Sequence, residues 1–228
     1  MMKTRYIYIL MLGILSIVGT GCEERLDIPK HGNLGGQEDF YKTDDDALQA
    51  LASLYNTWGG NYYNWFYVKN LLADDVWCGG GSRGDNASME QLNEYTFDTD
   101  HGMVQSLYSG LYGVIYKSNL IVDLLAPDTE AKKRAVAEAM FFRAWSHFEL
   151  VTLFGTAPIV DHLLSPDEYR LGNSNPKDTW SFIESDLMSA LNSEALPSKA
   201  GVDDQETGIR VTKEVAQAIY GVQEVAKN

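Results

Sequence analysis

The sequence predicts an all-α fold, in which antiparallel helix pairs stack on one another and long loops join them. Apolar residues recur at intervals of three and four in one segment after another, which is the spacing of a buried helix face. Residues that start and stop helices flank these segments, and only residues 157–160 have an extended character. With 228 residues and 45% hydrophobic side chains, the chain is long enough for one domain with a real core.

Residues 1–21 are predicted to be a secretory signal peptide that is absent from the mature protein. Lys3 and Arg5 supply a short basic region, residues 6–18 form an apolar run, and small residues follow at 19–21. The apolar run of about 13 residues is too short to cross the hydrocarbon core of a bilayer, which is about 30 Å thick.

Cys22 follows these small residues, in the position of the lipidated cysteine of a bacterial lipobox. Gly19 stands where that pattern usually has an aliphatic residue, and an ordinary signal peptide with an incidental Cys22 is the alternative. If Cys22 carries lipid, residues 22–42 form the lipidated N-terminus and a polar, glycine-rich tether. Cys78 would then be a buried or half-buried free thiol, whereas a Cys22–Cys78 disulfide is the alternative in an oxidising compartment.

The first predicted helix starts at Thr43 or Asp44 and ends at Trp58, before two glycines. Either starting residue can cap the first backbone amides, and the acidic residues of the first turn suit the helix dipole. A second helix is predicted from residue 64 to about residue 76. Residues 78–100 are predicted to be a long loop, and loops of this length in a compact domain are usually functional or disordered.

Two longer helices are predicted over about 103–125 and over 129–154. The apolar face of the second one comprises, at steps of four and three residues, Ala137, Phe141, Ala144, Phe148 and Val151. Gly155 can supply the C-terminal cap and Pro158 prevents any continuation, so the pattern predicts a buried and well-terminated helix.

Two more helices are predicted, one with Pro176 in its first turn and one from Thr212 onward. Ala137 and Ala144 are small residues at expected helix crossings, which favours a tetratricopeptide-like stack, although no clean 34-residue repeat is visible. The last helix has no visible partner after it, and we therefore expect the sequence to be a fragment of a longer chain.

The composition excludes several classes of function. A net charge of −14 argues against binding of nucleic acid, because a phosphate-binding surface must be basic. The sequence has no metal-ligand spacing of the CxxC or HxxxH kind, no phosphate loop and no nucleophile elbow, and no cofactor is expected. Arg143 and Glu149 are expected to make polar contacts between helices and not to take part in catalysis. His147, within the long helix, is expected to be a packed or hydrogen-bonded histidine.

Several stretches resemble the SusD/RagB family of outer-membrane nutrient-binding lipoproteins. The specific part runs from Arg143-Ala-Trp145 through Leu150-Val151 to Leu153-Phe-Gly155. The other matching stretches, in family order and spacing, are 22–29, 40–47, 112–119, 137–160, 178–187 and 211–218. Tyr108 stands where the family often has tryptophan, and family members continue well past this C-terminus. The resemblance implies a SusD-like fold, with residues 43–228 as an N-terminal helical domain that is incomplete at its C-terminal end.

The resemblance also implies a function that is not enzymatic. Family members capture oligosaccharides, or in some branches peptides, and pass them to a SusC-like TonB-dependent transporter. Acidic residues directly after Cys22 resemble the cell-surface signal of Bacteroidetes lipoproteins, which implies a lipid-anchored protein at the outer membrane. A tetratricopeptide-type adaptor for other proteins, anchored to the same membrane, is the alternative. A glycosidase would need two carboxyl groups about 5–9.5 Å apart, and the sequence offers no candidate pair.

The resemblance further implies that ligand is held by aromatic side chains on loops. An aromatic cluster begins at Trp58, and within and after it Tyr62, Trp65 and Trp77 are the candidates for a stacking platform. Arg83 and Asp85, in the predicted loop, are candidates for hydrogen bonds to sugar hydroxyls. The alternative for each aromatic residue is a place in the core, and the alternative for the two charged residues is simple solvation.

Overall fold

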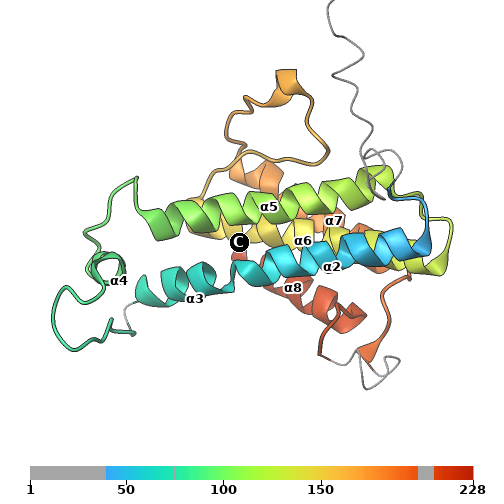
Figure 1. Ribbon diagram of the computed structural model, residues 1–228. Helices are drawn as coiled ribbons and strands as arrows, with labels where there is room; N and C mark the ends of the chain where they lie inside the picture. Colours follow the sequence, from blue (N-terminus) through green and yellow to red (C-terminus); the bar gives the residue numbers. More distant parts are fainter. Residues whose placement is uncertain (1–39, 74, 200–207, 228) are drawn as a thin grey trace, which may run out of the picture. The chain divides into compact units, whose positions relative to one another are not determined.

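The computed structural model describes residues 40–73, 75–199 and 208–227, and within them every regular element is a helix (Figure 1). In chain order the helices are α2 (Asp44–Gly60), α3 (Tyr62–Leu71), α4 (Ala87–Asn93), α5 (Gly102–Leu124), α6 (Glu130–Phe154), the 3-10 turn η1 (Pro166–Glu168), α7 (Pro176–Asn192) and α8 (Lys213–Ala226). The prediction of an all-α fold is confirmed. The predicted signal peptide, Cys22 and nearly all of the predicted tether lie outside the described residues. None of the helices just named combines the length and the apolar character needed to cross a membrane.

Helix α6 is the central element of the helical domain. It packs against α2, α5, α7 and α8, and Figure 1 shows α2 and α5 running side by side with α6 behind them. One core fills the space between α2, α5, α6 and α7, and its members include Leu54, Val114, Phe142, Ile183 and Leu187. A second core lies around α3, α4 and α5, with Val68, Leu71, Leu92, Leu111 and Leu150 among its members.

The burial of α6 is wider than the single apolar face that its periodicity predicts. Ala137, Phe141, Ala144 and Val151 are buried as expected, whereas Phe148 is only half-buried and packs against Trp180. Polar side chains on other sides of α6 are buried too, because helices contact it from several directions. The prediction of a buried helix is confirmed, and the prediction of one buried face is too narrow.

The start of α2 follows from its local sequence. Thr43 Oγ1 accepts a hydrogen bond from the Asp46 amide at 3.1 Å, and Asp46 Oδ2 accepts one from the Thr43 amide at 2.8 Å. This reciprocal capping box satisfies two amides that the first helical turn leaves without partners. Phe40 and Tyr41, at the end of the predicted tether, stack edge to face and pack against the first core. These two residues therefore belong to the folded domain.

The ends of the other long helices also follow from local signals. The α6 helix stops at Gly155, whose φ of +73° lies in the region that favours glycine, and the Gly155 amide donates to the Val151 carbonyl at 3.0 Å. Pro176 occupies the first position of α7, and the Asn175 side chain caps that helix by accepting from the Lys177 amide at 2.9 Å.

The region between α3 and α5 differs from its prediction. Helix α3 ends at Leu71, five residues before the predicted end, and the predicted loop contains the short helix α4. Asn93, at the end of α4, donates to the carbonyls of Leu71 and Val76 at 3.4 and 2.8 Å. The Tyr95 hydroxyl donates to the Leu72 carbonyl. The carbonyls of Leu71 and Leu72 are groups that a longer α3 would use for its own backbone hydrogen bonds.

A buried set of polar groups, the Arg143 network, joins α5, α6 and α7. Arg143 Nε and Nη2 donate to the two carboxylate oxygens of Asp186 at 2.7 and 2.8 Å. Arg143 Nη1 donates to Asn119 Oδ1 at 2.8 Å and to the Asp161 carbonyl at 2.6 Å. Because these four residues provide one another's partners, the network fixes three helices and one connecting segment.

The extended segment 157–162 is held by side chains of α5 and α6 and not by a sheet. The Tyr112 hydroxyl donates to the Pro158 carbonyl at 2.7 Å, and Asn119 Nδ2 donates to the Val160 carbonyl at 3.1 Å. His147 Nδ1 donates to the Arg143 carbonyl at 2.9 Å, and its Nε2 accepts from the Val160 amide at 3.3 Å. The interhelix role predicted for Arg143 is confirmed, and His147 is a buried, hydrogen-bonded histidine as predicted.

Candidate functional site

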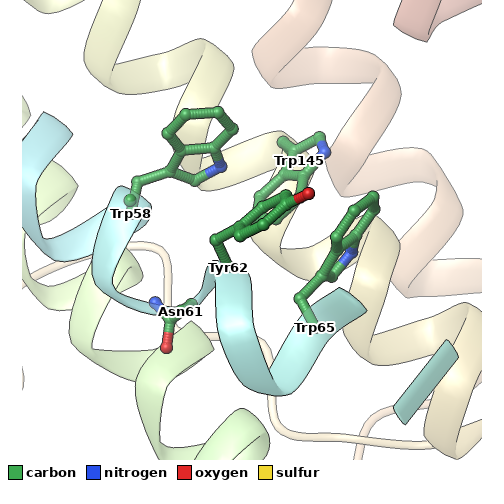
Figure 2. Close-up of a pocket in the computed structure, with 6 residues that line it drawn as sticks. Trp58, Asn61, Tyr62, Trp65 and Trp145 are labelled. Atoms are coloured by element: carbon green, nitrogen blue, oxygen red, sulfur yellow. The ribbon is translucent and has the colours of Figure 1, made fainter. Parts of the chain in front are cut away.

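An aromatic pocket lies where α2 meets α3, beside α6. The residues that line it surround a cavity of about 230 Å³, and they are Trp58, Gly59, Asn61, Tyr62, Trp65 and Trp145. Figure 2 shows the side chains of Trp58, Tyr62, Trp65 and Trp145 gathered around this space, with Asn61 directed away from them. Three helices thus contribute to one aromatic surface.

The corner between α2 and α3 is fixed by a close approach between Asn61 and Gly110. Asn61 Nδ2 donates to the Gly110 carbonyl at 3.2 Å and to the Thr57 carbonyl at 3.0 Å. A Cβ atom on Gly110 would lie only 1.7 Å from Asn61 Oδ1, which is far inside van der Waals contact. Glycine at this point of α5 therefore allows Asn61 to reach the backbone and set the angle between α2 and α3.

The rings of the aromatic pocket contact one another through Trp145. Its centroid lies 5.7 Å from that of Trp58, in an edge-to-face arrangement, and 6.4 Å from that of Trp65. The Tyr62 and Trp65 centroids are 6.3 Å apart. Such contacts hold aromatic rings in defined orientations. Trp58 is nevertheless 38% exposed and Tyr62 is 62% exposed, which leaves aromatic surface open to a ligand.

The aromatic pocket has few polar side-chain groups. The Asn61 amide is occupied by its two backbone carbonyls. The Trp65 indole nitrogen is buried and has no hydrogen-bond partner within the described part of the chain. The Tyr62 hydroxyl belongs to an exposed residue and can donate to or accept from a bound molecule. The pocket thus combines apolar faces with a small number of groups suited to hydroxyl oxygens.

A pair of opposite charges, Lys69 and Glu149, lies beside Trp65. Lys69 Nζ lies 4.9 Å from the Trp65 ring centroid, which is the geometry of a cation–π contact. The same ammonium donates to both carboxylate oxygens of the buried Glu149, at 3.1 and 2.9 Å. This pair joins α3 to α6, and it confirms the interhelix role predicted for Glu149.

A second pocket, the loop pocket, lies between the loop after α3 and helix α4. Its volume is about 250 Å³, and the lining residues are Trp77, Cys78, Gly80, Ser82, Arg83, Glu90 and Glu94. Trp77 is 73% exposed, and Arg83 forms an exposed ion pair with Glu94 at 2.8 Å. Cys78 is a half-buried free thiol within the described residues, whereas its alternative disulfide partner Cys22 lies outside them.

Asp85 shapes the loop beside this second pocket. Its carboxylate accepts from the Ser82 amide and from the Ser82 hydroxyl, both at 2.9 Å. These hydrogen bonds lower the pKa of Asp85, because they stabilise the charged form. The carboxylate is therefore committed to the turn at residues 82–85.

The structure divides the predicted site residues between two places. Tyr62 and Trp65 share the aromatic pocket, whereas Trp77 and Arg83 share the loop pocket. The three aromatic candidates do not form one platform. Trp145 was not predicted as a pocket residue. A signal for it was nevertheless present, because Trp145 stands outside the predicted apolar face of its helix, and an aromatic residue outside that face can lie at the surface.

The chemistry of the aromatic pocket is that of binding. The residues that line it include no carboxylate, histidine or cysteine, and its only ionisable side chain is the exposed Tyr62. Within the described ranges, no group of three or more His, Cys, Asp or Glu side chains is placed to hold a metal ion. Stacked aromatic faces with a few polar groups are typical of sites for small organic ligands.

Comparisons with known proteins agree with this interpretation. Residues 43–221 match the model of a SusD-like family that is described as "Starch-binding associating with outer membrane". A SusD-like protein of Formosa agariphila is 29% identical over 205 residues, which cover 82% of this chain and 39% of that protein. A SusD-like protein of Bacteroides ovatus is 24% identical over 209 residues, which cover 85% of this chain and 36% of that protein. The chain thus spans less than half the length of these curated relatives.

Solved structures show the same fold. A laminarin-binding SusD-like protein superposes with a TM-score of 0.72 at 26% identity, over 82% of this chain and 41% of that one. The surface glycan-binding protein A of Bacteroides uniformis gives a TM-score of 0.69 at 22% identity, over 82% and 42% of the two chains. Because the family model covers most of the chain and the fold agrees, this protein belongs to the SusD-like family.

Proposed function

We propose that this chain is part of a cell-surface lipoprotein that captures oligosaccharides and delivers them to a SusC-like TonB-dependent transporter of the outer membrane. The family description, which names starch binding and the outer membrane, supports the general role. A similar solved structure belongs to a protein described as laminarin-binding. The observation that carries the proposal for this chain is the aromatic surface formed by the exposed Trp58 and Tyr62 and the half-buried Trp145.

The geometry of the aromatic pocket suits a sugar ring. One face of a pyranose ring presents C–H groups, and such a face packs well on the flat, electron-rich surface of an indole or a phenol. The cavity of about 230 Å³ lies below the range of about 300–1,000 Å³ for drug-sized ligands, which favours one ring unit at a time. Further units of an oligosaccharide would continue along the surface outside the pocket.

The loop pocket is proposed as a second contact for the same class of ligand. Trp77 offers a largely exposed ring, and one nitrogen of the Arg83 guanidinium is bound to Glu94. The remaining guanidinium N–H groups can donate to hydroxyl oxygens. Asp85 would contribute by holding the turn in place, through its bonds to Ser82.

Affinity electrophoresis of the full chain in gels that contain neutral polysaccharides tests the proposal. Tyr62→Ala should weaken retardation by about two- to tenfold, because one aromatic contact contributes about 0.5–1.5 kcal/mol. Trp77→Ala should also weaken retardation, and its effect should be independent of the Tyr62→Ala effect, because the two residues line different pockets. Tyr169→Ala is the matched control, because Tyr169 is similarly exposed, at 68%, and lines neither pocket. If none of the polysaccharides in the panel slows the wild-type chain, the binding role is wrong.

Anchoring and delivery need separate experiments. Cys22→Ala should release the protein from the outer-membrane fraction, and continued fractionation with that membrane would remove the case for lipidation. Affinity purification from outer membranes should recover a TonB-dependent transporter with the wild-type protein. Recovery of a soluble periplasmic partner in its place would favour the adaptor function.

A further inference from the structure

We propose that the aromatic pocket selects neutral sugar rings and discriminates against rings that carry a carboxylate or a sulfate. The inference rests on the proposed function, and it specifies the class of carbohydrate that this pocket accepts. The observations behind it are the uncharged lining of the pocket, the closed Lys69–Glu149 pair beside it, and the negative charge of the chain.

The lining of the aromatic pocket offers nothing that would neutralise a bound anion. Its six residues are four aromatic side chains, one glycine and one asparagine. The Asn61 amide nitrogen, which could donate to an anion, is already bound to two backbone carbonyls. A carboxylate that enters such an apolar space loses its hydration without gaining a cation, and that transfer is strongly unfavourable.

Lys69 is the cation that lies next to these rings, and its charge is already compensated. It contacts the Trp65 ring and donates to both oxygens of Glu149, whose side chain is only 3% exposed. A sugar carboxylate would have to compete with this buried, bidentate partner for the same ammonium group. The pair therefore supplies a cation–π contact to Trp65 without presenting a net positive charge to the pocket.

Charges outside the aromatic pocket also disfavour an anionic ligand. The net charge of the chain is −14, so a polyanion is repelled during its approach. In the loop pocket, Arg83 pairs with Glu94 and Glu90 is a further lining residue, so the carboxylates outnumber the guanidinium there. A neutral ring, by contrast, needs only the apolar faces of the pocket and the indole N–H and phenol groups as partners for its hydroxyls.

Matched ligands test this inference directly. Isothermal titration with the full chain would compare soluble starch, laminarin and barley β-glucan, each beside its own carboxymethylated form. Every neutral polymer that binds should do so at least tenfold more tightly than its carboxymethylated form. Its affinity should change little between 50 and 500 mM NaCl, because no ion pair is involved. Equal or tighter binding of a carboxymethylated form would overturn the inference, whereas failure of all six polymers to bind would overturn the proposed function itself.

Two variants should shift the ratio between the affinity for a neutral polymer and the affinity for its carboxymethylated form. Glu149→Gln removes the partner of Lys69 while keeping the shape of the side chain, and it should raise the relative affinity for the carboxymethylated polymer severalfold, in a salt-sensitive way. Because Glu149 is buried, Tyr62→Lys provides a second route, in which the new cation stands at an exposed position. The change from Tyr169 to Lys adds the same charge away from both pockets and should leave the ratio unchanged. An unaltered ratio in both pocket variants would contradict the proposed basis of selection.

Discussion

Arg143 and Trp145 stand two residues apart on α6, and they reverse the usual distribution of charged and aromatic side chains. Arg143 is 5% exposed and lies inside the Arg143 network, whereas Trp145 is half-buried and lines the aromatic pocket. Two residues along a helix correspond to a rotation of about 200°, so the two side chains point to opposite sides. Charged residues are rarely buried without a partner, and large aromatic residues at a surface often mark a binding site.

The two regions differ in how their polar groups are satisfied. In the Arg143 network the partners come from Asn119, Asp161 and Asp186, all from the chain itself. In the aromatic pocket the Trp65 indole N–H has no partner in the described part of the chain. The first arrangement stabilises one conformation of the helices, whereas the second leaves the hydroxyl of the exposed Tyr62 for a ligand to use. Substitutions in the two regions should therefore affect different measurements.

The largest effect on stability is expected from Arg143→Met. The substitution leaves Asp186 buried without its partner, and the loss of one member of a buried ion pair costs about 3–5 kcal/mol. Urea unfolding followed by circular dichroism would measure the change. Arg83→Met is the control, because its ion pair with Glu94 is exposed and should contribute only about 0–1 kcal/mol. The double variant Arg143→Met/Asp186→Leu should recover much of the loss. A loss below about 1 kcal/mol for Arg143→Met would show that the network does not stabilise the fold.

The second-largest effect on stability is a loss at low pH, which we expect from His147, beside the Arg143 network. Burial lowers the pKa of His147 to about 4, so the folded protein keeps this ring neutral at pH values where the unfolded chain takes up a proton. Stability from this group is present above the ordinary pKa of about 6.5 and is lost as the pH falls from 6.5 to 4. Between pH 7.5 and pH 5 the loss should be about 2 kcal/mol.

The comparison of wild type with His147→Gln isolates this contribution, through urea unfolding at both pH values. The wild-type protein should lose more stability at low pH than the variant does. His162 has a pKa raised by its hydrogen bonds to Asp161 and Glu168, so its contribution has the opposite sign, lost as the pH rises through its folded pKa. His162→Gln therefore serves as the control. An identical pH dependence in wild type and His147→Gln would mean that His147 is not held neutral.

Gly110→Ala should affect both stability and binding, because it acts on the corner that carries the aromatic pocket. The added Cβ would displace Asn61, and overpacking of this kind costs about 1–3 kcal/mol. Gly113→Ala, one turn further along α5, meets its nearest atom at an ordinary 3.6 Å and should be neutral or stabilising. Urea unfolding and affinity electrophoresis would be measured on both variants. Equal behaviour of the two would show that the Asn61–Gly110 contact does not position the pocket.

Much of the fold can be predicted from the sequence because its signals are local. The cap at Thr43, the proline at the first position of α7 and the terminating Gly155 act within one helical turn, and the structure has all three. The end of α3 could not be predicted in this way. It depends on Asn93 and Tyr95, which reach carbonyl groups 17 to 23 residues earlier in the chain.

The candidate site shows the same division between local and distant contacts. Tyr62 and Trp65 lie three residues apart on one helix, so their proximity follows from sequence spacing. The contact of Trp65 with Trp145 depends on where α3 lies relative to α6, across about 80 residues of chain. The separation of Trp77 from these rings has a similar cause, because the early end of α3 sends the following chain toward α4.

The smallest effect on stability is expected from Tyr62→Ala, and this sharpens the contrast with Arg143. Tyr62 is 62% exposed, and substitutions at exposed positions usually change stability by less than about 0.5 kcal/mol. Its ring contacts with Trp65 and Phe66 are at the surface, where solvent can replace them. Urea unfolding should therefore give nearly the wild-type midpoint, while retardation by neutral polysaccharide falls. A destabilisation above about 1 kcal/mol would mean that the ring serves the fold, and the separation between a stabilising network and a binding pocket would no longer hold.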